Sequence, residues 1–353
     1  MTETQLVPEA IFIEQMNGFR PIIRELSARF GCELIYGELN ELISGDKAHN
    51  EVVGLVKGPR TKLSAEMFTK IANVMQDPII AYIGRHPRKI LDDEVEYNKR
   101  CFHGQEVLLV QTKNKEIPIL SIEQSPLSFA VAFYVLGVTG AILEGRRNEI
   151  MNLTIQGGNT FDKRMGHNFN DNHSGDADVF RDYNIGVIGV GDIGSKVARA
   201  FSERGSRVYY TATTQKEYYD VNAEFVPTIE DLLQCVGVSS TPSILTIHLP
   251  SGVKVPLKHV GNVDILVNTS SGSNIDEGEL IEALDEGRIG HAVVDVFKFE
   301  GKDFYRDKFS RLASDGRLTL TPHIAYNEPH AIRKTLEMAM QNIMFYRHSK
   351  VKI

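Results

Sequence analysis

Three glycines at residues 189, 191 and 194 follow a short apolar run and precede an amphipathic helical pattern. In a strand–turn–helix unit, Gly189 permits the tight turn, Gly191 lets the backbone approach a pyrophosphate, and Gly194 lets the helix pack on the strand. The start of the helix offers N–H groups and a positive dipole end to phosphates. The spacing alone also occurs in kinases and in glycine-tolerant turns, but this context favours a dinucleotide site. We expect that site to include Gly189, Gly191, Asp192, Ile193 and Gly194.

The end of the next strand indicates which dinucleotide fits. An Asp or Glu about 20 residues after the glycines normally binds the ribose 2′-hydroxyl of NAD. By strand alignment this position is Ala212, and no carboxylate follows before Glu217. Thr213 and Thr214 can hydrogen-bond a 2′-phosphate, and Lys216 can neutralise it. The sequence therefore favours NADP over NAD, and the alternative is an NAD site with a weakened ribose contact.

Strand and helix patterns alternate regularly from residue 184 onward. Strands are expected at 185–189, 207–211, 244–248, 264–268, 292–296 and 318–321, and helices at 194–204, 228–235, 276–287 and 328–347. This rhythm is typical of a Rossmann-type, doubly wound parallel sheet, in which ligands lie beyond the carboxyl ends of the strands. We therefore expect further cofactor contacts from the strand-end residues His248, Leu249, Pro250, Thr269, Ser270 and Asp295.

The first 123 residues show a second alternation without a phosphate motif, which predicts a smaller, flavodoxin-like α/β domain. Its expected elements include helices at 19–30 and 61–74, the latter with Ser64 as a candidate N-cap, and strands at 32–36, 52–56, 79–83, 107–110 and 119–122. A long helix at 127–147 follows, and its apolar character on nearly all sides indicates burial in a core or at a subunit interface.

Composition excludes several classes of protein. The 353 residues exceed one ordinary core, so two domains are expected. The net charge of -7 argues against a nucleic-acid binder. No apolar run approaches the roughly 20 residues of a membrane helix, and the N-terminus lacks signal-peptide features. The 3 cysteines are far apart and fit no metal site. We expect a cytoplasmic protein without nucleic-acid, membrane or metal partners.

An ordered set of short motifs in the second half resembles the D-isomer-specific 2-hydroxyacid dehydrogenases. The set comprises the glycine motif, His248-Leu249-Pro250, Asn268-Thr269, Asp276-Glu277, Ala283-Leu284, Gly287-Arg288-Ile289, Asp295-Val296-Phe297 and Thr321-Pro322-His323. The resemblance covers roughly residues 180–345 and is weak in the N-terminal half. It implies a substrate domain at 1–123, completed by the C-terminal helix at 328–353, and a dinucleotide-binding domain at 124–327.

The resemblance implies hydride transfer between a nicotinamide and the carbon of a C–OH/C=O pair in a small-molecule substrate. The family's general acid/base is the histidine of the Thr-Pro-His motif, which falls on His323. The family's partner carboxylate falls on Glu300, which would orient the imidazole and stabilise its charged form. The alternative is that His323 only ends a strand and that Glu300 is a surface acid.

The chain departs from the family at one catalytic position. The family's segment usually reads Asn-Thr-Ala-Arg-Gly, whereas residues 268–272 here read Asn-Thr-Ser-Ser-Gly. The arginine binds the substrate carboxylate and polarises the carbonyl, which suits a planar bidentate cation. Ser271 stands in its place and offers one neutral hydrogen bond. Losing such a contact removes about 3 to 4 kcal/mol of transition-state stabilisation, so ordinary 2-keto acid reduction should be poor.

Three accounts of this departure remain open. The substrate carries no 2-carboxylate; or another cation reaches the site; or the protein binds nucleotide without turnover, as a regulatory or partner-binding protein. Retention of His323 and Glu300 favours an enzyme. Candidate substrate-binding residues lie on two loops that should face the cleft, Lys57, Gly58 and Arg60 on one and Gly84 and Arg85 on the other, with Arg88 nearby. In relatives the long helix after the first domain helps form a two-fold dimer, so we expect a homodimer. A helix buried within one chain would show the same apolar pattern.

Overall fold

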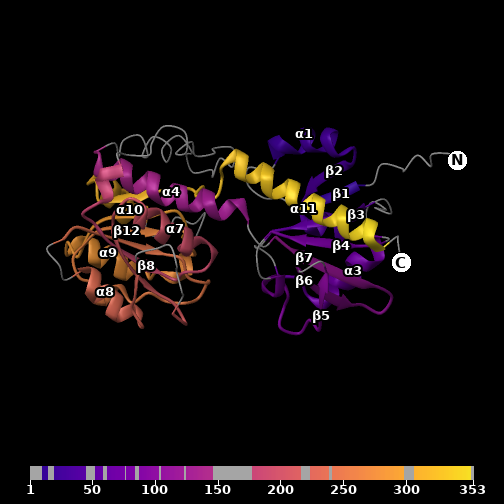
Figure 1. Cartoon of the computed structure of the whole chain (residues 1–353), viewed down its shortest axis with the longest axis horizontal. Helices are drawn as coiled ribbons and strands as arrows, with labels where there is room; N and C mark the ends of the chain where they lie inside the picture. The colour runs from indigo at the N-terminus through magenta and orange to yellow at the C-terminus, as the bar shows by residue number, and fades with distance from the viewer. Residues whose placement is uncertain are drawn as a thin grey trace. The chain divides into compact units, whose positions relative to one another are not determined.

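The computed structural model describes most of the chain and resolves it into two units. The described residues are 10–14, 20–44, 52–58, 62–75, 77–83, 87–102, 105–122, 125–145, 177–215, 223–237, 241–297 and 306–350. The N-terminal unit contains those up to Pro126 together with those from Pro329 onward, and the central unit spans Leu127–Glu328 (Figure 1). Each unit has its own sheet.

The sheet of the N-terminal unit has the order β2-β1-β3-β4-β7-β6-β5. Its strands are β1 (Ala10–Glu14), β2 (Glu33–Gly37), β3 (Val52–Lys57), β4 (Ile79–Tyr82), β5 (Asn98–Phe102), β6 (Gln105–Gln111) and β7 (Glu116–Ser121). The first five strands of that order are parallel, and β6 runs antiparallel to both β5 and β7. The parallel part has the flavodoxin order 2-1-3-4-5, so the expected α/β fold of this half is confirmed.

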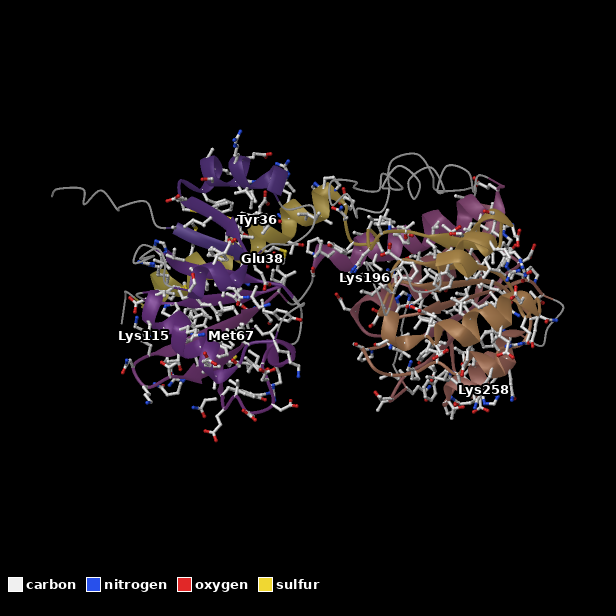
Figure 2. The ribbon with its side chains drawn as sticks, turned by 180° about the vertical axis from the view of Figure 1, so that it is seen from behind. Tyr36, Glu38, Met67, Lys115, Lys196 and Lys258 are labelled. Atoms are coloured by element: carbon white, nitrogen blue, oxygen red, sulfur yellow. The ribbon has the colours of Figure 1, made fainter. Side chains whose placement is uncertain are left out.

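Four helices accompany this sheet in the described chain: α1 (Arg20–Phe30), α2 (Leu39–Ile43), α3 (Ala65–Val74) and α11 (Pro329–Lys350), with a 3₁₀ turn η1 at Pro87–Ile90. Helix α3 begins later than residue 61 because the Ser64 hydroxyl accepts a hydrogen bond from Met67 N and caps it. Its other end is closed by Lys115, whose ammonium donates to Ala72 O at 2.7 Å and Met75 O at 2.6 Å (Figure 2). A cation suits the negative end of the helix dipole.

The C-terminal helix α11 packs on the N-terminal sheet across β3 and β4. The close approach depends on Gly54 in β3, because a Cβ there would lie 2.8 Å from Ile343 Cγ2 and 2.9 Å from Ile343 Cδ1. The opposite face of the sheet carries a core that includes Phe12, Leu55 and Phe68. Both faces are therefore covered, which explains why β1 and β3 are buried along their whole length.

The sheet of the central unit is fully parallel, with the order β10-β9-β8-β11-β12-β13-β14. Its strands are β8 (Asn184–Ile188), β9 (Arg207–Thr211), β10 (Ala223–Phe225), β11 (Ser243–Ile247), β12 (Val263–Asn268), β13 (Ile289–Val294) and β14 (Leu318–Leu320). This is the Rossmann order 3-2-1-4-5-6 with one further strand, so the predicted doubly wound sheet is confirmed. The order reverses between β8 and β11, where such folds bind their ligands.

Helices cover both faces of the central sheet (Figure 1). They are α4 (Pro126–Leu143), α7 (Asp192–Ser202), α8 (Ile229–Gly237), α9 (Glu277–Asp285) and α10 (Arg306–Ser314), with 3₁₀ turns η2 (Ala177–Phe180), η3 (Leu257–His259) and η4 (Gly272–Asn274). Strand β8 divides its side chains between two cores: Ile185 and Val187 pack with residues of α4 and α7, and Ile188 packs with residues of α8 to α10. Asp276 caps α9, accepting hydrogen bonds from Gly278 N and Glu279 N.

Helix α4 corrects one sequence argument. Its 18 residues are long and apolar enough to cross a membrane by length and composition, so the statement that no run approaches that length is wrong. Two thirds of the helix is nevertheless buried inside the fold, as in the core helix of a globular protein. Phe129 and Phe133 are its most exposed residues, with 50% and 48% of their surface exposed one helical turn apart.

Candidate active site

The turn after β8 needs two of its three glycines for reasons internal to the protein. Gly189 has φ of 89°, in the left-handed region, and a Cβ there would lie 2.7 Å from His248 O. A Cβ at Gly194 would lie only 1.9 Å from Gly189 O, so any side chain would push α7 away from the turn. The sequence reading of these two positions, one for the turn and one for helix packing, agrees with this geometry.

Gly191 differs, because a Cβ at this position would meet nothing within 4 Å. The residue is the N-cap of α7, and it has no side chain to occupy the first-turn N–H groups of Ile193 and Gly194. Nothing in the described protein requires glycine here, whereas a group bound against the helix start would. The residues present therefore fit the pyrophosphate of a dinucleotide.

This contrast predicts different outcomes for two alanine variants. Gly191→Ala should leave the melting temperature within about 2 °C of wild type and weaken nucleotide binding at least tenfold, which is about 1.4 kcal/mol. Gly194→Ala should lower the melting temperature as well, because its Cβ meets backbone. Thermal unfolding and fluorescence titration with NADH and NADPH measure both properties. Wild-type affinity in Gly191→Ala would contradict a pyrophosphate at this turn.

The end of β9 lies beside the glycine turn, because Gly189 N donates to Thr211 O at 3.0 Å. Ala212 is half-buried, and Thr213 and Thr214 are exposed. No carboxylate occurs in residues 211–215, the part of this loop that the structure describes. Lys216 lies outside the described residues.

Two buried polar atoms without partners mark the ends of β11 and β12. His248 and Thr269 follow the paired residues Ile247 and Asn268, so they are neighbours across the sheet. His248 Nε2 lies 2.8 Å from Thr246 Oγ1, but His248 Nδ1 and Thr269 Oγ1 are buried and have no hydrogen-bond partner among the described residues. Burial lowers the pKa of His248 to about 3, so its ring is neutral at physiological pH. Unsatisfied buried atoms are rare, and a bound ligand is one explanation for them.

The loops after these strands are tied together by serine and asparagine side chains. Ser270 donates to Asn268 Oδ1 from its backbone N at 3.1 Å and from its hydroxyl at 2.9 Å. Asn274 Nδ2 donates to Pro250 O at 2.7 Å, which fixes the loop that carries Leu249 and Pro250. Leu249 also borders the glycine turn, since its Cδ2 would lie 3.1 Å from a Cβ at Gly189.

Ser271, at the position of the family's arginine, belongs to a cluster of three hydroxyls. The Ser273 Oγ lies 2.9 Å from Ser271 Oγ and 2.9 Å from Ser251 Oγ, and Ser271 Oγ lies 3.3 Å from Ser251 Oγ. Ser271 Oγ also accepts from Ser273 N at 3.3 Å and so caps η4. We call Ser251, Ser271 and Ser273 the serine cluster. It is neutral and hydroxyl-lined where the family pattern has a cation.

His323 sits in a strained backbone conformation that its surroundings maintain. Its φ of 54° is the one positive value at a non-glycine residue within the described ranges. Its backbone N donates to Asp295 O and Thr321 O, both at 3.0 Å. Its ring meets that of Tyr326 edge-on, with centroids 5.4 Å apart and planes at 88°. Such conformations cost of order 1–3 kcal/mol and often occur at functional sites.

The buried carboxylate of Asp295 accepts hydrogen bonds from the segment 321–325, which contains His323. Its Oδ1 accepts from Thr321 Oγ1 at 2.6 Å and from Ile324 N at 2.9 Å, and its Oδ2 accepts from Ala325 N at 3.0 Å. Burial raises the pKa of Asp295, and the neighbouring His323 and these hydrogen bonds oppose that shift. Asp295 was expected to contact the cofactor, but both its oxygens bind residues 321–325. The Asp295 motif and the Thr321-Pro322-His323 motif are both visible in the sequence. That they meet at the ends of β13 and β14 is not.

Several predicted residues lie outside the described residues: Glu300, Arg60, Gly84 and Arg85. Their roles stay predictions. Lys57 and Gly58 are described, and the Lys57 side chain is fully buried. Its ammonium donates to Glu14 Oε2 at 2.9 Å and to Gly58 O at 2.8 Å, while Gly58 N donates to the same carboxylate oxygen at 2.9 Å. Burial lowers the pKa of Lys57, and Glu14 opposes the shift. The substrate contact expected of Lys57 would require this amine to leave its ion pair.

The ion pair between Lys57 and Glu14 should contribute measurably to the free energy of unfolding. Lys57→Met leaves a buried carboxylate without its cation and should lower the free energy of unfolding by about 3–5 kcal/mol. The double variant Glu14→Gln/Lys57→Met keeps an acceptor for Gly58 N without any charge, and should recover at least half of that loss. Urea denaturation measures both. A double variant as unstable as the single one would show that packing, not charge, decides the effect.

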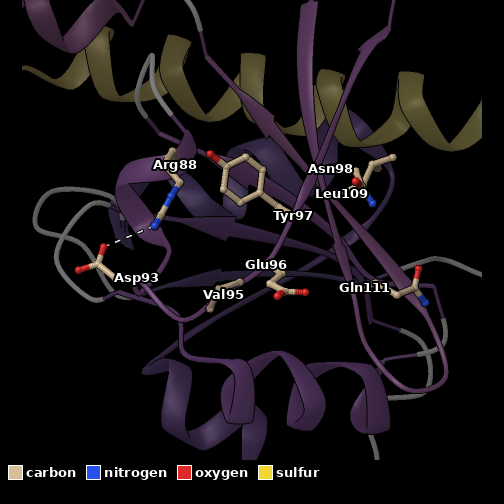
Figure 3. A pocket seen from close by; sticks show the side chains of 8 residues that line it. All are labelled: Arg88, Asp93, Val95, Glu96, Tyr97, Asn98, Leu109 and Gln111. Atoms are coloured by element: carbon tan, nitrogen blue, oxygen red, sulfur yellow. Dashed lines mark hydrogen bonds and ion pairs between the residues drawn. The ribbon is translucent and has the colours of Figure 1, made fainter.

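Arg88 also has its own partners in the N-terminal unit. Its guanidinium donates to Leu91 O at 2.8 Å, to Asp92 O at 3.3 Å and to the Asp93 carboxylate at 3.4 Å. It also lies over the Tyr97 ring, 5.5 Å from the centroid. Together with strand residues it lines a hollow of about 530 Å³ (Figure 3), whose wall comprises Arg88, Asp93, Val95, Glu96, Tyr97, Asn98, Leu109 and Gln111. The guanidinium of Arg88 is thus bound by neighbouring residues of the same segment.

Comparison with known proteins agrees with this geometry. Residues 150–325 match the family model described as D-isomer specific 2-hydroxyacid dehydrogenase, NAD binding domain. A glyoxylate reductase of Pyrococcus horikoshii is 31% identical over 172 residues, covering 47% of this chain and 49% of that protein. A D-specific alpha-keto acid dehydrogenase of Enterococcus faecalis is 29% identical over 185 residues, covering 48% of this chain and 54% of that protein. The match thus spans about half the length of these curated relatives.

Solved structures extend the likeness of fold to nearly the whole chain. The apo D-lactate dehydrogenase of Escherichia coli aligns with a TM-score of 0.64 and 18% identity, over 97% of both chains. The D-lactate dehydrogenase of Lactobacillus jensenii with NAD+ aligns with a TM-score of 0.59 and 20% identity, over 95% of this chain and 96% of that one. At such identities the likeness shows the fold alone.

Proposed function

Because this chain belongs to the D-isomer-specific 2-hydroxyacid dehydrogenase family, we propose that it is a nicotinamide-dependent oxidoreductase acting on a small carbonyl or hydroxy compound. The observation that carries the proposal is the segment 321–325, which Asp295 holds in a strained conformation with His323 at its centre. A protein that only binds nucleotide has no need to maintain such a histidine.

The roles of the residues follow from their chemistry. The bound nicotinamide supplies or accepts the hydride. His323 gives a proton to the carbonyl oxygen during reduction and removes one from the hydroxyl during oxidation. Glu300, at the position of the family's partner carboxylate, orients the imidazole. The glycine turn and the start of α7 bind the pyrophosphate, and Thr269 and His248 supply polar atoms at the neighbouring strand ends.

A panel of aldehydes, ketones and 2-keto acids, assayed with NADH and NADPH, tests the activity. We expect turnover with at least one carbonyl compound. Nucleotide binding without turnover on any of them would support the rival, a nucleotide-dependent regulatory protein. Failure to bind either nucleotide below millimolar concentration would exclude both.

We propose NADPH as the preferred cofactor. The support is the end of β9, where Thr213 and Thr214 offer hydroxyls to the ribose 2′-position and Ala212 stands where NAD-binding sites have a carboxylate. NADPH should therefore bind more tightly than NADH in the same titration. The family model describes an NAD-binding domain, so tighter binding of NADH is the result that would overturn this preference.

We propose that the substrate is not an ordinary 2-keto acid. The serine cluster supplies neutral hydroxyls at the family's arginine position, and these suit a hydroxyl, amide or ester better than a carboxylate. Wild type should therefore reduce pyruvate and glyoxylate poorly.

Restoring the cation should restore that activity. Ser271→Arg should raise kcat/KM for glyoxylate or pyruvate about 10²-fold, the scale of one stabilising donor at a reacting carbonyl. Ser271→Met is the control, because it adds a long side chain without charge and should give no gain. Steady-state kinetics measure both. An equal lack of activity in both variants would contradict the view that the missing cation blocks 2-keto acids.

We also propose a homodimer. Phe129 and Phe133 expose about half of their surface on α4, and burying such a pair against a second copy would remove apolar area from water. Replacing both by serine should shift the protein to a monomer in light scattering.

A further inference from the structure

A buried chain of hydroxyl groups joins helix α4 to the segment that carries His323. Tyr134 lies in the middle of α4 and is fully buried, and its hydroxyl is 2.5 Å from Thr321 Oγ1. Thr321 Oγ1 in turn donates to Asp295 Oδ1 at 2.6 Å. A hydroxyl has one proton, so Thr321 accepts from Tyr134 while it donates to the carboxylate. The direction of the chain is therefore Tyr134 to Thr321 to Asp295.

We propose that Tyr134 is a positioning residue for the acid/base segment: its hydroxyl, through Thr321 and Asp295, holds residues 321–325 in the conformation that presents His323. The proposal rests on the proposed function for the role of His323, but the contacts themselves do not. Tyr134 acts through other residues and is not itself catalytic.

Three features favour this role over simple core packing. The chain ends on a carboxylate whose other hydrogen bonds go to Ile324 N and Ala325 N, directly after His323. The backbone of His323 is strained, so it needs external contacts to persist. Burial raises the pKa of Tyr134 well above 10, which keeps the phenol protonated and able to donate at any physiological pH.

Helix α4 offers a matched control. Thr139 is also fully buried on this helix, but its hydroxyl donates to Val135 O and Leu136 O within α4. Thr139→Val and Tyr134→Phe therefore each remove one buried hydroxyl from the same helix. Only the second removes a link to His323.

Kinetics and cofactor binding separate the two variants. Tyr134→Phe should lower kcat about tenfold or more, shift the pH profile of kcat, and leave cofactor affinity unchanged. Thr139→Val should keep the wild-type kcat and pH profile. In a double-mutant cycle, Tyr134→Phe should add little to Thr321→Val, because both break one chain. Independent, additive effects of the two substitutions, or a wild-type kcat and pH profile in Tyr134→Phe, would overturn the proposal.

A readout without turnover keeps the test separate from the proposed function. The imidazole Cε1–H signal of His323, assigned by its loss in His323→Asn, is sensitive to the ring current of Tyr326, which lies edge-on to it. In ¹³C-histidine spectra Tyr134→Phe should move or broaden this signal, and Thr139→Val should not. If the protein reduces no compound of the carbonyl panel but Tyr134→Phe still moves the signal, the proposed enzymatic function is wrong and the positioning role of Tyr134 stands. An unmoved signal removes the link whether or not the enzyme turns over. Should Tyr134→Phe not fold, Thr321→Val breaks the same chain at its second residue and is judged by the same signal.

Discussion

Replacing His323 by asparagine should lower kcat by about 10²–10⁴-fold and leave the dissociation constant for NADPH or NADH unchanged. General acid/base catalysis by a positioned side chain contributes an effect of this size. Asparagine is the informative replacement, because His323 has φ of 54° and asparagine tolerates that region better than alanine does. A loss of rate without a loss of stability then reports on the imidazole alone.

His259 supplies the control for this variant. It is an exposed histidine of the same unit, in η3, so His259→Asn should retain wild-type rate and binding. Steady-state kinetics, nucleotide titration and thermal unfolding measure the three properties. Residual activity near wild type in His323→Asn would remove this residue from the mechanism.

Asp295→Asn should be the most damaging conservative change in the central unit, with a loss of about 2–4 kcal/mol in the free energy of unfolding and a fall in kcat of about 10²-fold. The carboxylate accepts from three donors through two oxygens. An amide retains one oxygen and turns an N–H group toward another donor, which leaves buried groups unsatisfied at about 1–3 kcal/mol each. The rate falls because residues 321–325, with His323 among them, lose their alignment.

Asp264→Asn distinguishes this effect from a general loss of charge. Asp264 is exposed and accepts from Ser243 N at 2.6 Å, a contact that the amide oxygen can keep. The free energy of unfolding of Asp264→Asn, measured in urea, should stay within about 1 kcal/mol of wild type. If Asp295→Asn proved equally mild, the carboxylate would not be the group that holds the segment.

The central unit was predictable because its strands are apolar runs separated by helices of regular length. Two of the strands absent from the prediction, β10 and β5, lack an apolar run. β10 is three residues long and only partly buried, and β5 is almost wholly exposed. In the N-terminal unit, β1 is a five-residue apolar segment with no helical pattern before it, and the prediction omitted it.

The residues of the candidate site also fall into those with a local sequence pattern and those without one. The roles of Gly189 and Gly194 follow from a local pattern, so the sequence predicts them well. The burial of Lys57 depends on Glu14, which is distant in sequence but ends β1, the strand paired with β3. The hold of Asp295 on residues 321–325 likewise depends on the adjacency of β13 and β14. Pairings of this kind are created by the topology and have no local sequence signature.

Transfer of isotope from the cofactor to a product tests the central claim most directly. The protein is incubated with NADPH and NADH deuterated at the transferred position and with a mixed pool of carbonyl compounds, and the hydroxy products are examined by mass spectrometry. The account predicts a deuterated product with wild type and at most trace amounts with His323→Asn at equal cofactor occupancy. Bound nucleotide with no deuterium in any product, or equal labelling by both proteins, would contradict it.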